Sequence, residues 1–494
     1  MESSSPSPAP RLGSTIFKNT AFVTAGNLLL KALSFLFGVF VIRRLGDDRY
    51  GQYAIILAFV GLFQIFAEMG MTQFVMREIA RNRQKAGQYF WNLVAVRLLL
   101  ALINILIIPF LAYAYGYASE VILGIFLYTL TFLLAAFEAT FQATLTANER
   151  LEYISTINVS GQITFMLLGA AFLFSGFSFL WLVVASLLAF IPRLGVGIWA
   201  VRRHRLFPQK VQLTPTTWPG LVKSGLPFGV ITLTLIIATS IDTVMLSKLE
   251  PEYVVGWYNV AYGLVMSIAF LSNGFKDAIV PSLTRVHTSQ PEMVRAWYHH
   301  TAKLFVALAL PLAVGGMILA EPITVFLYKP EFQPAAAALR ILVWDIPFLM
   351  YAGFCGRITT VIGEERAAAR IYTINAAANV LLNLVMIPAY GMLGAAIVTV
   401  ITDLVSAAQF YRLLRKKLAP PAFSPHLLRI ALAAGLMGAG VYATGGLHFF
   451  VRIILGSALY LALILLLRLP DEAEWGWIQA GAQKIARLMH LKTT

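Results

Sequence analysis

The chain has 494 residues, of which 59% are hydrophobic and only 12% are charged, with a mean hydropathy of +0.75. A soluble domain carries about 25% charged residues, so this chain cannot coat a soluble globule and most of its surface must face lipid. The composition excludes a soluble enzyme, a nucleic-acid-binding protein and a disordered protein, and the single cysteine, Cys355, excludes a disulfide framework or a cysteine-rich metal site.

Apolar segments of membrane-spanning length follow one another along the chain. The first is preceded by a polar, Ser/Pro-rich stretch, residues 1–14, which we expect to be a disordered cytoplasmic tail. This stretch lacks the pattern of a cleaved signal peptide, so the first segment is predicted to be a helix. Long continuous runs also exclude a β-barrel. Fourteen transmembrane helices are predicted, at residues 18–42, 51–76, 89–113, 121–147, 154–176, 178–201, 221–247, 253–284, 299–327, 335–362, 367–387, 393–411, 427–445 and 451–469.

Lysine and arginine predict the orientation of these helices. With the N-terminus placed in the cytoplasm, inside segments hold 26 Lys and Arg residues and outside loops hold 6. Positive residues favour cytoplasmic loops, so this bias predicts that both termini are cytoplasmic. We therefore expect a multi-pass protein of the cytoplasmic (inner) membrane. Its net charge of +15 arises mainly from the lysine and arginine residues of the inside segments.

The connecting loops are too short to hold a catalytic domain. Outside loops such as 43–50 and 328–334 hold fewer than ten residues, and the longest inside connections hold about twenty. The sequence contains no HExxH, no G-x4-GK-[ST] and no G-x-S-x-G motif. We therefore expect a transporter without catalytic residues, metal or cofactor, and we exclude a membrane glycosyltransferase, polymerase or ligase.

The last segment, residues 470–494, has a different pattern. Trp475, Ile478, Ile485 and Leu488 recur at helical spacing among polar residues. This pattern predicts an amphipathic helix that lies in the membrane interface.

The two halves of the chain resemble each other. Residues 43–81 align with residues 247–285, and residues 146–162 align with residues 362–379. The matches fall in the same order at a similar offset, and each repeat contains six predicted helices. An even number means that both halves enter the membrane from the same side, so a pseudo-twofold axis runs along the membrane normal.

This repeat gives the predicted domain organisation. We predict an all-α polytopic membrane protein with two six-helix lobes and a C-terminal helix pair. Such a duplication favours a transporter whose substrate path lies between two lobes. The expected parts are the N-lobe at 15–205, a cytoplasmic linker at 206–220, the C-lobe at 221–417, helices 13 and 14 at 418–469, and the interfacial helix at 470–494.

Among the ionisable residues within the predicted spans, we single out twelve. Each costs roughly 2.5–3.5 kcal/mol at the middle of a span, so these side chains must meet water, one another or a ligand. Six are basic and six are acidic, so their number alone does not make a cationic cavity. They are Lys31, Glu68, Arg97, Glu138, Arg193, Asp242, Lys276, Asp277, Arg340, Asp345, Arg357 and Asp403.

Neighbouring residues indicate which charges face the interior. Lys31 and Lys276 each share a helix face with small or polar residues, which is typical of a face toward the protein interior or a cavity. Arg97 and Arg193 lie nearer the ends of spans, where an arginine can reach the interface. The amides Asn375 and Asn379 are interpreted as close helix packing.

The stretch RRLGDDRYGQYAIILAFVGLFQIFAEMGMTQFVMREIAR, at residues 43–81, carries an LG-x3-YG-x-Y loop and a later acidic-Met-Gly turn. With the repeat and the helix count, it resembles the polysaccharide transporters of the multidrug/oligosaccharidyl-lipid/polysaccharide (MOP) exporter superfamily, which include O-antigen-type flippases. The resemblance covers roughly residues 15–417. It implies a two-lobe exporter fold with a central polar cavity.

The same resemblance implies a function and a set of site residues. The function is translocation of a polyprenyl-diphosphate-linked oligosaccharide from the inner to the outer leaflet by alternating access. Membrane lipid and a polysaccharide polymerase or assembly proteins are the expected further partners, and nucleic acid is not. The candidate substrate-binding residues are Lys31, Lys276, Arg357 and Arg97, and the candidate ion-coupling residues are Glu68, Asp242 and Asp403.

Two related functions stay open on the sequence. A multidrug/cation antiporter of the same superfamily would share the lobes and bind cations through buried carboxylates. A flippase for the lipid precursor of peptidoglycan would differ in its glycan. Clustered lysine and arginine favour an anionic lipid-linked glycan, whereas an isolated carboxylate favours cation antiport.

Overall fold

The structure is a computed structural model that describes residues 9–82, 86–206, 211–286, 289–418, 424–469 and 475–476. Throughout these residues the regular secondary structure is helical, as the long apolar runs predict. A chain in lipid must satisfy its backbone hydrogen bonds internally, and a helix does so within one segment. The predicted interfacial helix at 470–494 lies outside the described residues apart from 475–476.

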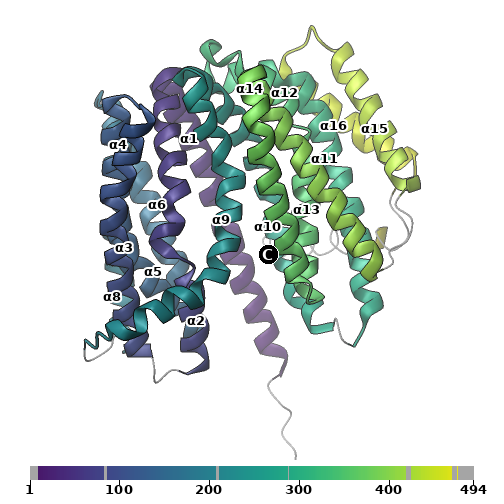
Figure 1. Ribbon diagram of the computed structural model, residues 1–494. Helices are drawn as coiled ribbons and strands as arrows, with labels where there is room; N and C mark the ends of the chain where they lie inside the picture. The colour runs from purple at the N-terminus through teal and green to yellow at the C-terminus, as the bar shows by residue number, and fades with distance from the viewer. Residues whose placement is uncertain are drawn as a thin grey trace, which may run out of the picture. The chain divides into compact units, whose positions relative to one another are not determined.

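The N-terminal unit comprises residues 1–233 (Figure 1). Helix α1 begins at Ala9, so residues 9–14 of the expected disordered tail are helical. Figure 1 shows α1, α3 and α4 side by side, and these helices contact one another. The helices of this unit are α1 (Ala9–Glu68), α2 (Met71–Arg81), α3 (Ala86–Tyr115), α4 (Ser119–Thr129), α5 (Thr131–Ala147), α6 (Leu151–Phe174), α7 (Leu180–Leu188), α8 (Phe190–Arg203) and the short η2 (Pro215–Thr217).

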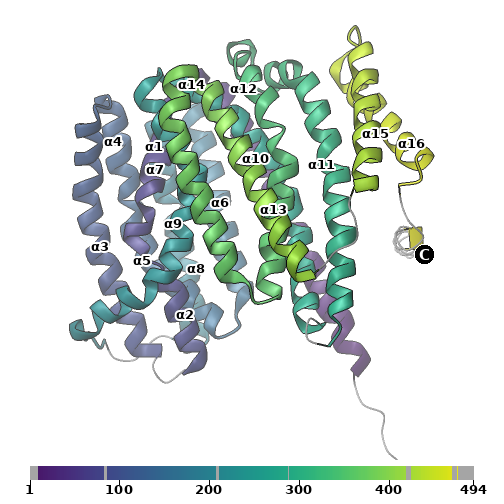
Figure 2. The same cartoon turned by 45° about the vertical axis from the view of Figure 1, so that its right-hand side comes forward.

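The C-terminal unit comprises residues 234–494, and the boundary between the units falls within α9 (Trp218–Leu249). Helices α11, α15 and α16 of this unit pack side by side (Figure 2). The predicted domain boundaries stay predictions. The other helices are α10 (Glu252–Val286), α11 (Pro291–Tyr328), η3 (Pro330–Phe332), α12 (Ala335–Leu342), α13 (Asp345–Val361), α14 (Glu365–Leu418), α15 (Ser424–Ala443) and α16 (Phe449–Leu466).

Two helices are long enough to contain two predicted spans each. Helix α1 has 60 residues and a break at Gly46, and α14 has 54 residues and a break at Gly391, both with positive φ. By length and composition, ten helices among the described residues can cross a membrane, or eleven if the bent pair α12–α13 counts as one span. The membrane-spanning, all-α architecture is confirmed, and the count of fourteen stays a prediction.

Each unit has its own apolar core. In the N-terminal unit, Phe90, Phe141 and Ile157 bring α3, α5 and α6 together. In the C-terminal unit, Leu319 and Met437 belong to a cluster shared by α11, α15 and α16. These cores fix the positions from which polar side chains project.

Candidate transport site

A buried carboxylate, Asp242 of α9, forms the centre of a polar cluster in the C-terminal unit. It is 4% exposed. The Tyr258 hydroxyl donates to its Oδ2 at 2.7 Å, the Thr399 hydroxyl donates to the same oxygen at 2.8 Å, and Asn383 Nδ2 donates to Oδ1 at 2.7 Å. Three neutral donors from α10 and α14 therefore stabilise one carboxylate within the helix bundle.

Helix α14 supplies a row of amides beside this carboxylate. Asn375, Asn379 and Asn383 repeat every four residues, which places them on one face of the helix. Asn383 Nδ2 also donates to Asn379 Oδ1 at 3.1 Å. The Oδ1 atoms of Asn383 and Asn375 are buried and have no hydrogen-bond partner within the described chain. Of the amides that we interpreted as helix packing, Asn379 therefore belongs to the polar cluster through Asn383, and Asn375 leaves its acceptor oxygen unused.

Two further carboxylates lie near Asp242. Asp345, the first residue of α13, is fully buried and has Asp242 and Asp403 as charged neighbours. Asp403 is half-buried on α14, four residues after Thr399. Among the described residues, no group of three or more His, Cys, Asp or Glu side chains is arranged to hold a metal ion.

The four predicted substrate-binding residues differ in their surroundings. Lys276 of α10 is 6% exposed, and its Nζ lies 2.8 Å from the position that a Cβ on Gly353 of α13 would occupy. Arg97 is also buried, whereas Lys31 on α1 and Arg357 on α13 are exposed within their own units. Their roles in binding stay predictions.

The N-terminal unit contains a second buried polar cluster. Arg97 of α3 donates from Nη1 to the Thr72 hydroxyl of α2 at 2.5 Å. Arg193 of α8 lies 3.6 Å from Glu138 of α5, measured from Nη1 to Oε1. Gln142 donates to the same Glu138 oxygen at 2.8 Å. Charges predicted within separate spans therefore meet inside one helical unit.

The sequence allows both arginines to reach the membrane interface, but the structure buries Arg97 and leaves only Arg193 partly exposed. Arg97 is 6% exposed, with Glu68 as a charged neighbour on α1, which is itself half-buried. The Arg193 side chain packs directly over α6, where Nε lies 1.8 Å from the position of a Cβ on Gly161. Glycine at that position leaves the space that the guanidinium occupies, so the Arg193 side chain, which is 26% exposed, packs against α6.

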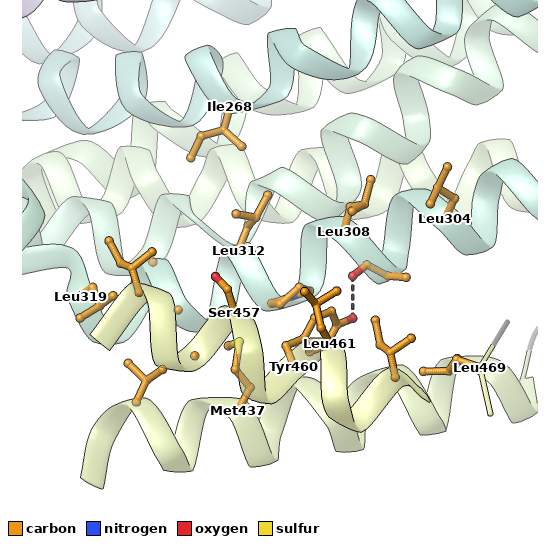
Figure 3. A pocket seen from close by; sticks show the side chains of 18 of the residues that line it. Ile268, Leu304, Leu308, Leu312, Leu319, Met437, Ser457, Tyr460, Leu461 and Leu469 are labelled. Carbon is orange, nitrogen blue, oxygen red and sulfur yellow. Dashed lines mark hydrogen bonds between the residues drawn. The ribbon is translucent and has the colours of Figure 1, made fainter. Parts of the chain in front are cut away.

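An apolar groove in the C-terminal unit lies between α11, α15 and α16 (Figure 3) and has a volume of about 980 Å³. Leu304, Leu308 and Leu312 repeat along one face of α11 and line one wall, yet each remains 41–49% exposed. On the opposite wall, the Tyr460 hydroxyl of α16 donates to the Ala307 carbonyl at 2.6 Å. The walls are thus joined across the groove while its leucines stay accessible from the lipid phase.

The groove extends through the depth of a membrane. Trp297 and Ile323 of α11 both line it and are 26 residues apart. At 1.5 Å per residue this separation is about 39 Å along the helix, compared with about 30 Å for the hydrocarbon core of a bilayer. The groove is therefore long enough to hold an extended apolar chain over the full thickness of the hydrocarbon core.

The sequence analysis did not identify several of these functional candidates. Tyr258 lies in the segment 247–285 that aligns with 43–81 in the internal repeat, and the four-residue spacing after Asn375 and Asn379 is the signal that could have identified Asn383. Thr399 and the groove residues carry no signal of their own, because hydroxyls and leucines occur throughout these helices.

Comparison with known proteins identifies the family. The sequence profile of the polysaccharide biosynthesis protein family matches residues 16–287, which is more than half of the chain. The chain belongs to this family. The MatE profile matches residues 227–386. The resemblance to polysaccharide transporters of the MOP superfamily is thus confirmed.

Two curated relatives of this family member are archaeal membrane proteins. The "Probable low-salt glycan biosynthesis flippase Agl15" of Haloferax volcanii is 21% identical over 386 residues, which are 76% of this chain and 78% of that protein. The "Uncharacterized membrane protein MJ1068" of Methanocaldococcus jannaschii is 33% identical over 90 residues, which cover 18% of each chain.

Solved structures show the same fold. The lipid II flippase MurJ in its inward closed conformation matches with a TM-score of 0.75 at 15% identity, covering 91% of this chain and 99% of that one. An inward-facing multidrug resistance MATE family transporter of the MOP superfamily matches with a TM-score of 0.62 at 17% identity, covering 78% and 94%. The MOP exporter fold expected from the sequence is confirmed.

Proposed function

We propose that this protein is a flippase, without catalytic activity, that moves a polyprenyl-diphosphate-linked oligosaccharide from the inner to the outer leaflet of the cytoplasmic membrane by alternating access. The observation that carries the proposal is a lipid-accessible apolar groove in the same unit as the buried Asp242 cluster and the buried Lys276. Such a unit suits a substrate with an apolar chain and a polar, charged head. The named glycan flippase among the relatives and the fold shared with a lipid flippase support the same function.

The apolar chain of the substrate is assigned to the groove. Its leucine wall faces lipid, so a chain that lies in it exchanges one apolar environment for another and needs no large driving force. Small-molecule sites have volumes of about 300–1,000 Å³, and the groove is at the upper end of that range at about 980 Å³. A long chain can therefore stay in the hydrocarbon while the head crosses.

The phosphates of the substrate are assigned to Lys276, with Lys31, Arg357 and Arg97 as further candidates. A diphosphate leaves water only if cations or oriented donors replace its hydration. Lys276 lies buried among helices of the C-terminal unit, where a phosphate would offset the cost of burying its ammonium group. An inside-negative membrane potential adds about 2.3 kcal/mol per charge per 100 mV to the outward movement of an anion.

The Asp242 cluster is assigned to ion coupling. Its carboxylate has only neutral hydrogen-bonding partners among the described residues, and the oxygen of Asn383, which donates to it, is unused. Hard cations such as sodium prefer oxygen ligands of this kind. Asp403 lies on the same helix face as Thr399 and is a second candidate, and Glu68 is the candidate in the N-terminal unit.

A cation antiporter is the second candidate function. The MatE profile covers the segment that contains Asp242, and a buried carboxylate of this kind also suits an antiporter. The groove favours the flippase, because a soluble cationic substrate has no use for an apolar site of membrane depth. A flippase for the peptidoglycan precursor would use the same groove and differ in its glycan.

Topology and partners belong to the same proposal. The 26-to-6 distribution of lysine and arginine supports cytoplasmic N- and C-termini. A polysaccharide polymerase or assembly proteins would receive the glycan on the outer side.

Reconstitution in liposomes tests the proposal. Purified protein is combined with a candidate polyprenyl-diphosphate-linked glycan, and a lectin or glycosidase added outside measures protein-dependent exposure of the glycan. We expect exposure with the wild type and a loss of about tenfold with Leu308→Trp, because the larger side chain fills the groove. Leu428→Trp is the matched control, since Leu428 lies on α15 outside the groove lining and is 73% exposed.

Two results would contradict the proposal. The flippase assignment fails if the wild type exposes none of the glycans. The role of the groove fails if Leu308→Trp and Leu428→Trp expose the glycan at equal rates.

A further inference from the structure

A small pocket lies in the N-terminal unit, where residues of α2, α3 and the first turns of α9 meet. Its volume is about 260 Å³, a little below the roughly 300–1,000 Å³ of sites for drug-sized ligands. One wall belongs to an apolar core in which Val75 of α2, Leu93 of α3 and Leu221 of α9 are buried together. The pocket therefore adjoins a packed core and has room for one small molecule.

Asn92 of α3 fixes another wall of the pocket. It is 1% exposed, and its Nδ2 donates to the carbonyl oxygens of Gln88 and Gln212 at 2.7 and 2.9 Å. Its Oδ1 accepts from the backbone N–H of Thr214 and from the indole N–H of Trp218, both at 2.8 Å. The amide thus uses both donors and both acceptor positions. The segment that leads into α9 is thereby tied to α3, and the pocket is held in shape without a ligand.

Three other polar side chains of the lining are available to a ligand. Gln88, Tyr89 and Ser224 are half-buried, and within the described chain their side chains have no hydrogen-bond partner. Hydroxyls on helices of this unit commonly donate to a carbonyl one turn earlier, as Thr140 and Thr144 do at 2.9 Å. Ser224 makes no such bond to the part of the chain that the structure describes. A polar group in a pocket gains from a partner, so the three groups favour a ligand with hydrogen-bonding groups.

The lining is uncharged, which restricts the class of ligand. No Asp, Glu, Lys or Arg of the described residues lines the pocket, and Glu78, a charged neighbour of Tyr89, lies outside the lining. A phosphate or carboxylate would lose its hydration here without a cation to replace it. The rings of Phe74 and Tyr89 stand edge to face with centroids 6.4 Å apart and add an aromatic surface. An uncharged sugar suits this lining, because its hydroxyls both donate and accept and its ring carries apolar C–H groups.

The pocket lies at helix ends that we expect at the cytoplasmic surface. Gln88 is in the first turn of α3, and Ser224 is in the second turn of α9. Lysine and arginine are concentrated in the segments before and at these helix starts, residues 77–88 and 202–223, and positive residues favour the cytoplasmic side. A prenyl-linked glycan holds its diphosphate at the membrane surface, with its first sugars beside it. The pocket is therefore at the level of those sugars.

We propose that this pocket binds an uncharged sugar residue of the lipid-linked glycan, a hexose or an N-acetylhexosamine, before the head crosses the membrane. The Gln88 amide and the Tyr89 and Ser224 hydroxyls form hydrogen bonds with the sugar hydroxyls, and the sugar ring packs against Phe74 and Tyr89. The inference rests on the proposed flippase function, and it adds a glycan-recognition site to the cations assigned to the phosphates. A free monosaccharide has the same chemistry, so the experiment distinguishes the two sources.

Photoaffinity labelling of the full chain in nanodiscs tests the pocket. The probes are N-acetylglucosamine with a diazirine in its acyl group and a glucoside with a diazirine in its aglycone, and mass spectrometry locates the adducts. We expect adducts with at least one probe on residues 86–92 or 217–224, and competition by the same sugar without the diazirine. Glucuronic acid should compete at least about tenfold less, because its carboxylate finds no cation in the lining.

Two glycine variants separate the pocket from the rest of the unit. Gly220 lines the pocket, and no packed neighbour lies within 4 Å of the position of a Cβ, so Gly220→Leu can fill the pocket without a clash at that atom. Gly195 of α8 has the same open space outside the lining, so Gly195→Leu is the matched control. Gly220→Leu should reduce labelling at least about tenfold and Gly195→Leu should leave it unchanged, with the two variants melting at the same temperature.

Smaller substitutions test the hydrogen bonds. Tyr89→Phe and Ser224→Ala each remove one hydroxyl from the pocket and keep most of the side-chain volume. Each should weaken labelling about two- to tenfold, as expected for the loss of one hydrogen bond. Labelling at the wild-type level in both variants would overturn the proposal.

Competition decides the source of the sugar. Farnesyl-diphosphate-linked N-acetylglucosamine should compete at least about tenfold more strongly than the free sugar, because its prenyl chain concentrates the sugar at the membrane surface. The proposal is overturned if the free sugar competes as strongly, if neither probe labels the pocket, or if Gly220→Leu labels like Gly195→Leu. None of these results involves transport. A wild type that exposes glycan in liposomes but is not labelled keeps the flippase function and loses this site, whereas a labelled wild type that exposes none loses the flippase function.

Discussion

Replacing Asp242 with asparagine separates the charge of the C-terminal cluster from its hydrogen bonds. The asparagine side chain has nearly the same shape as aspartate. Its oxygen can still accept from Asn383, and its amide group can donate to the Tyr258 and Thr399 hydroxyl oxygens, which act as acceptors when they rotate. Asp242→Asn therefore removes the negative charge while the three contacts can be kept.

The magnitude of the effect depends on the role of the carboxylate. A buried carboxylate with neutral partners is expensive to desolvate, so removing its charge should not destabilise the protein when no cation is bound. Under that condition Asp242→Asn should either raise the free energy of unfolding or change it by less than about 1 kcal/mol, because the net value of a hydrogen bond is small. A bound cation at 100 times its dissociation constant stabilises the folded state by about 2.7 kcal/mol. The wild type should gain this increment and Asp242→Asn should not.

Truncation of Asp242 to alanine should instead lower the free energy of unfolding, because it removes the acceptor of three buried donors. Thr399 also donates to the Ala395 carbonyl at 3.0 Å, and Asn383 keeps the Asn379 oxygen, so these two donors retain acceptors. Tyr258 keeps only a long contact of 3.4 Å to Thr399. One poorly paired buried donor and a small cavity should cost about 2–4 kcal/mol.

The assay uses the single, fully buried cysteine of the chain, Cys355. Its rate of alkylation on heating in detergent reports the opening of the C-terminal unit. Wild type and Asp242→Asn are compared in sodium and in choline chloride at equal ionic strength. The reasoning is refuted if sodium does not slow the alkylation of the wild type, or if Asp242→Asn responds to sodium as the wild type does.

The candidate phosphate-binding lysines and the glycines with positive φ give two further predictions. Lys276→Ala and Lys31→Ala should each reduce glycan exposure in liposomes by at least about tenfold, because each removes a candidate phosphate-binding cation. Both variants should remain folded, as judged by the protection of Cys355 from alkylation. Lys417→Ala, which removes an exposed ion pair, should leave glycan exposure unchanged, and full activity in both other lysine variants would refute the charge argument. Gly70→Ala should lower the free energy of unfolding by about 2–5 kcal/mol, because Gly70 has φ +67° and a Cβ would lie 2.4 Å from two backbone atoms of α9. Gly176→Ala, at φ +81° with open space around it, should cost only about 1–2 kcal/mol, and equal melting temperatures for the two variants would contradict the packing argument.

The sequence by itself determined the membrane-spanning helical class, the family and the set of charges to be explained. Apolar runs of this length leave a single stable backbone solution in lipid, because every N–H and C=O group must be paired within the segment. Charged residues within such runs stand out for the same reason, and Asp242 and Lys276 were identified on that basis. Helical periodicity also predicted that polar residues share faces, as the asparagines of α14 do.

Only the tertiary structure decided what each charge contacts. Lys31 and Lys276 look alike as mid-span lysines, yet the first is exposed within its unit and the second is buried. The hydrogen-bond partners of Asp242 lie 16, 141 and 157 residues further along the chain, and the Tyr460–Ala307 contact joins residues 153 apart. Periodicity defines the face of a helix, but the neighbour of that face is set by how all the helices pack together. Burial, partners and the groove are therefore properties of the assembled bundle.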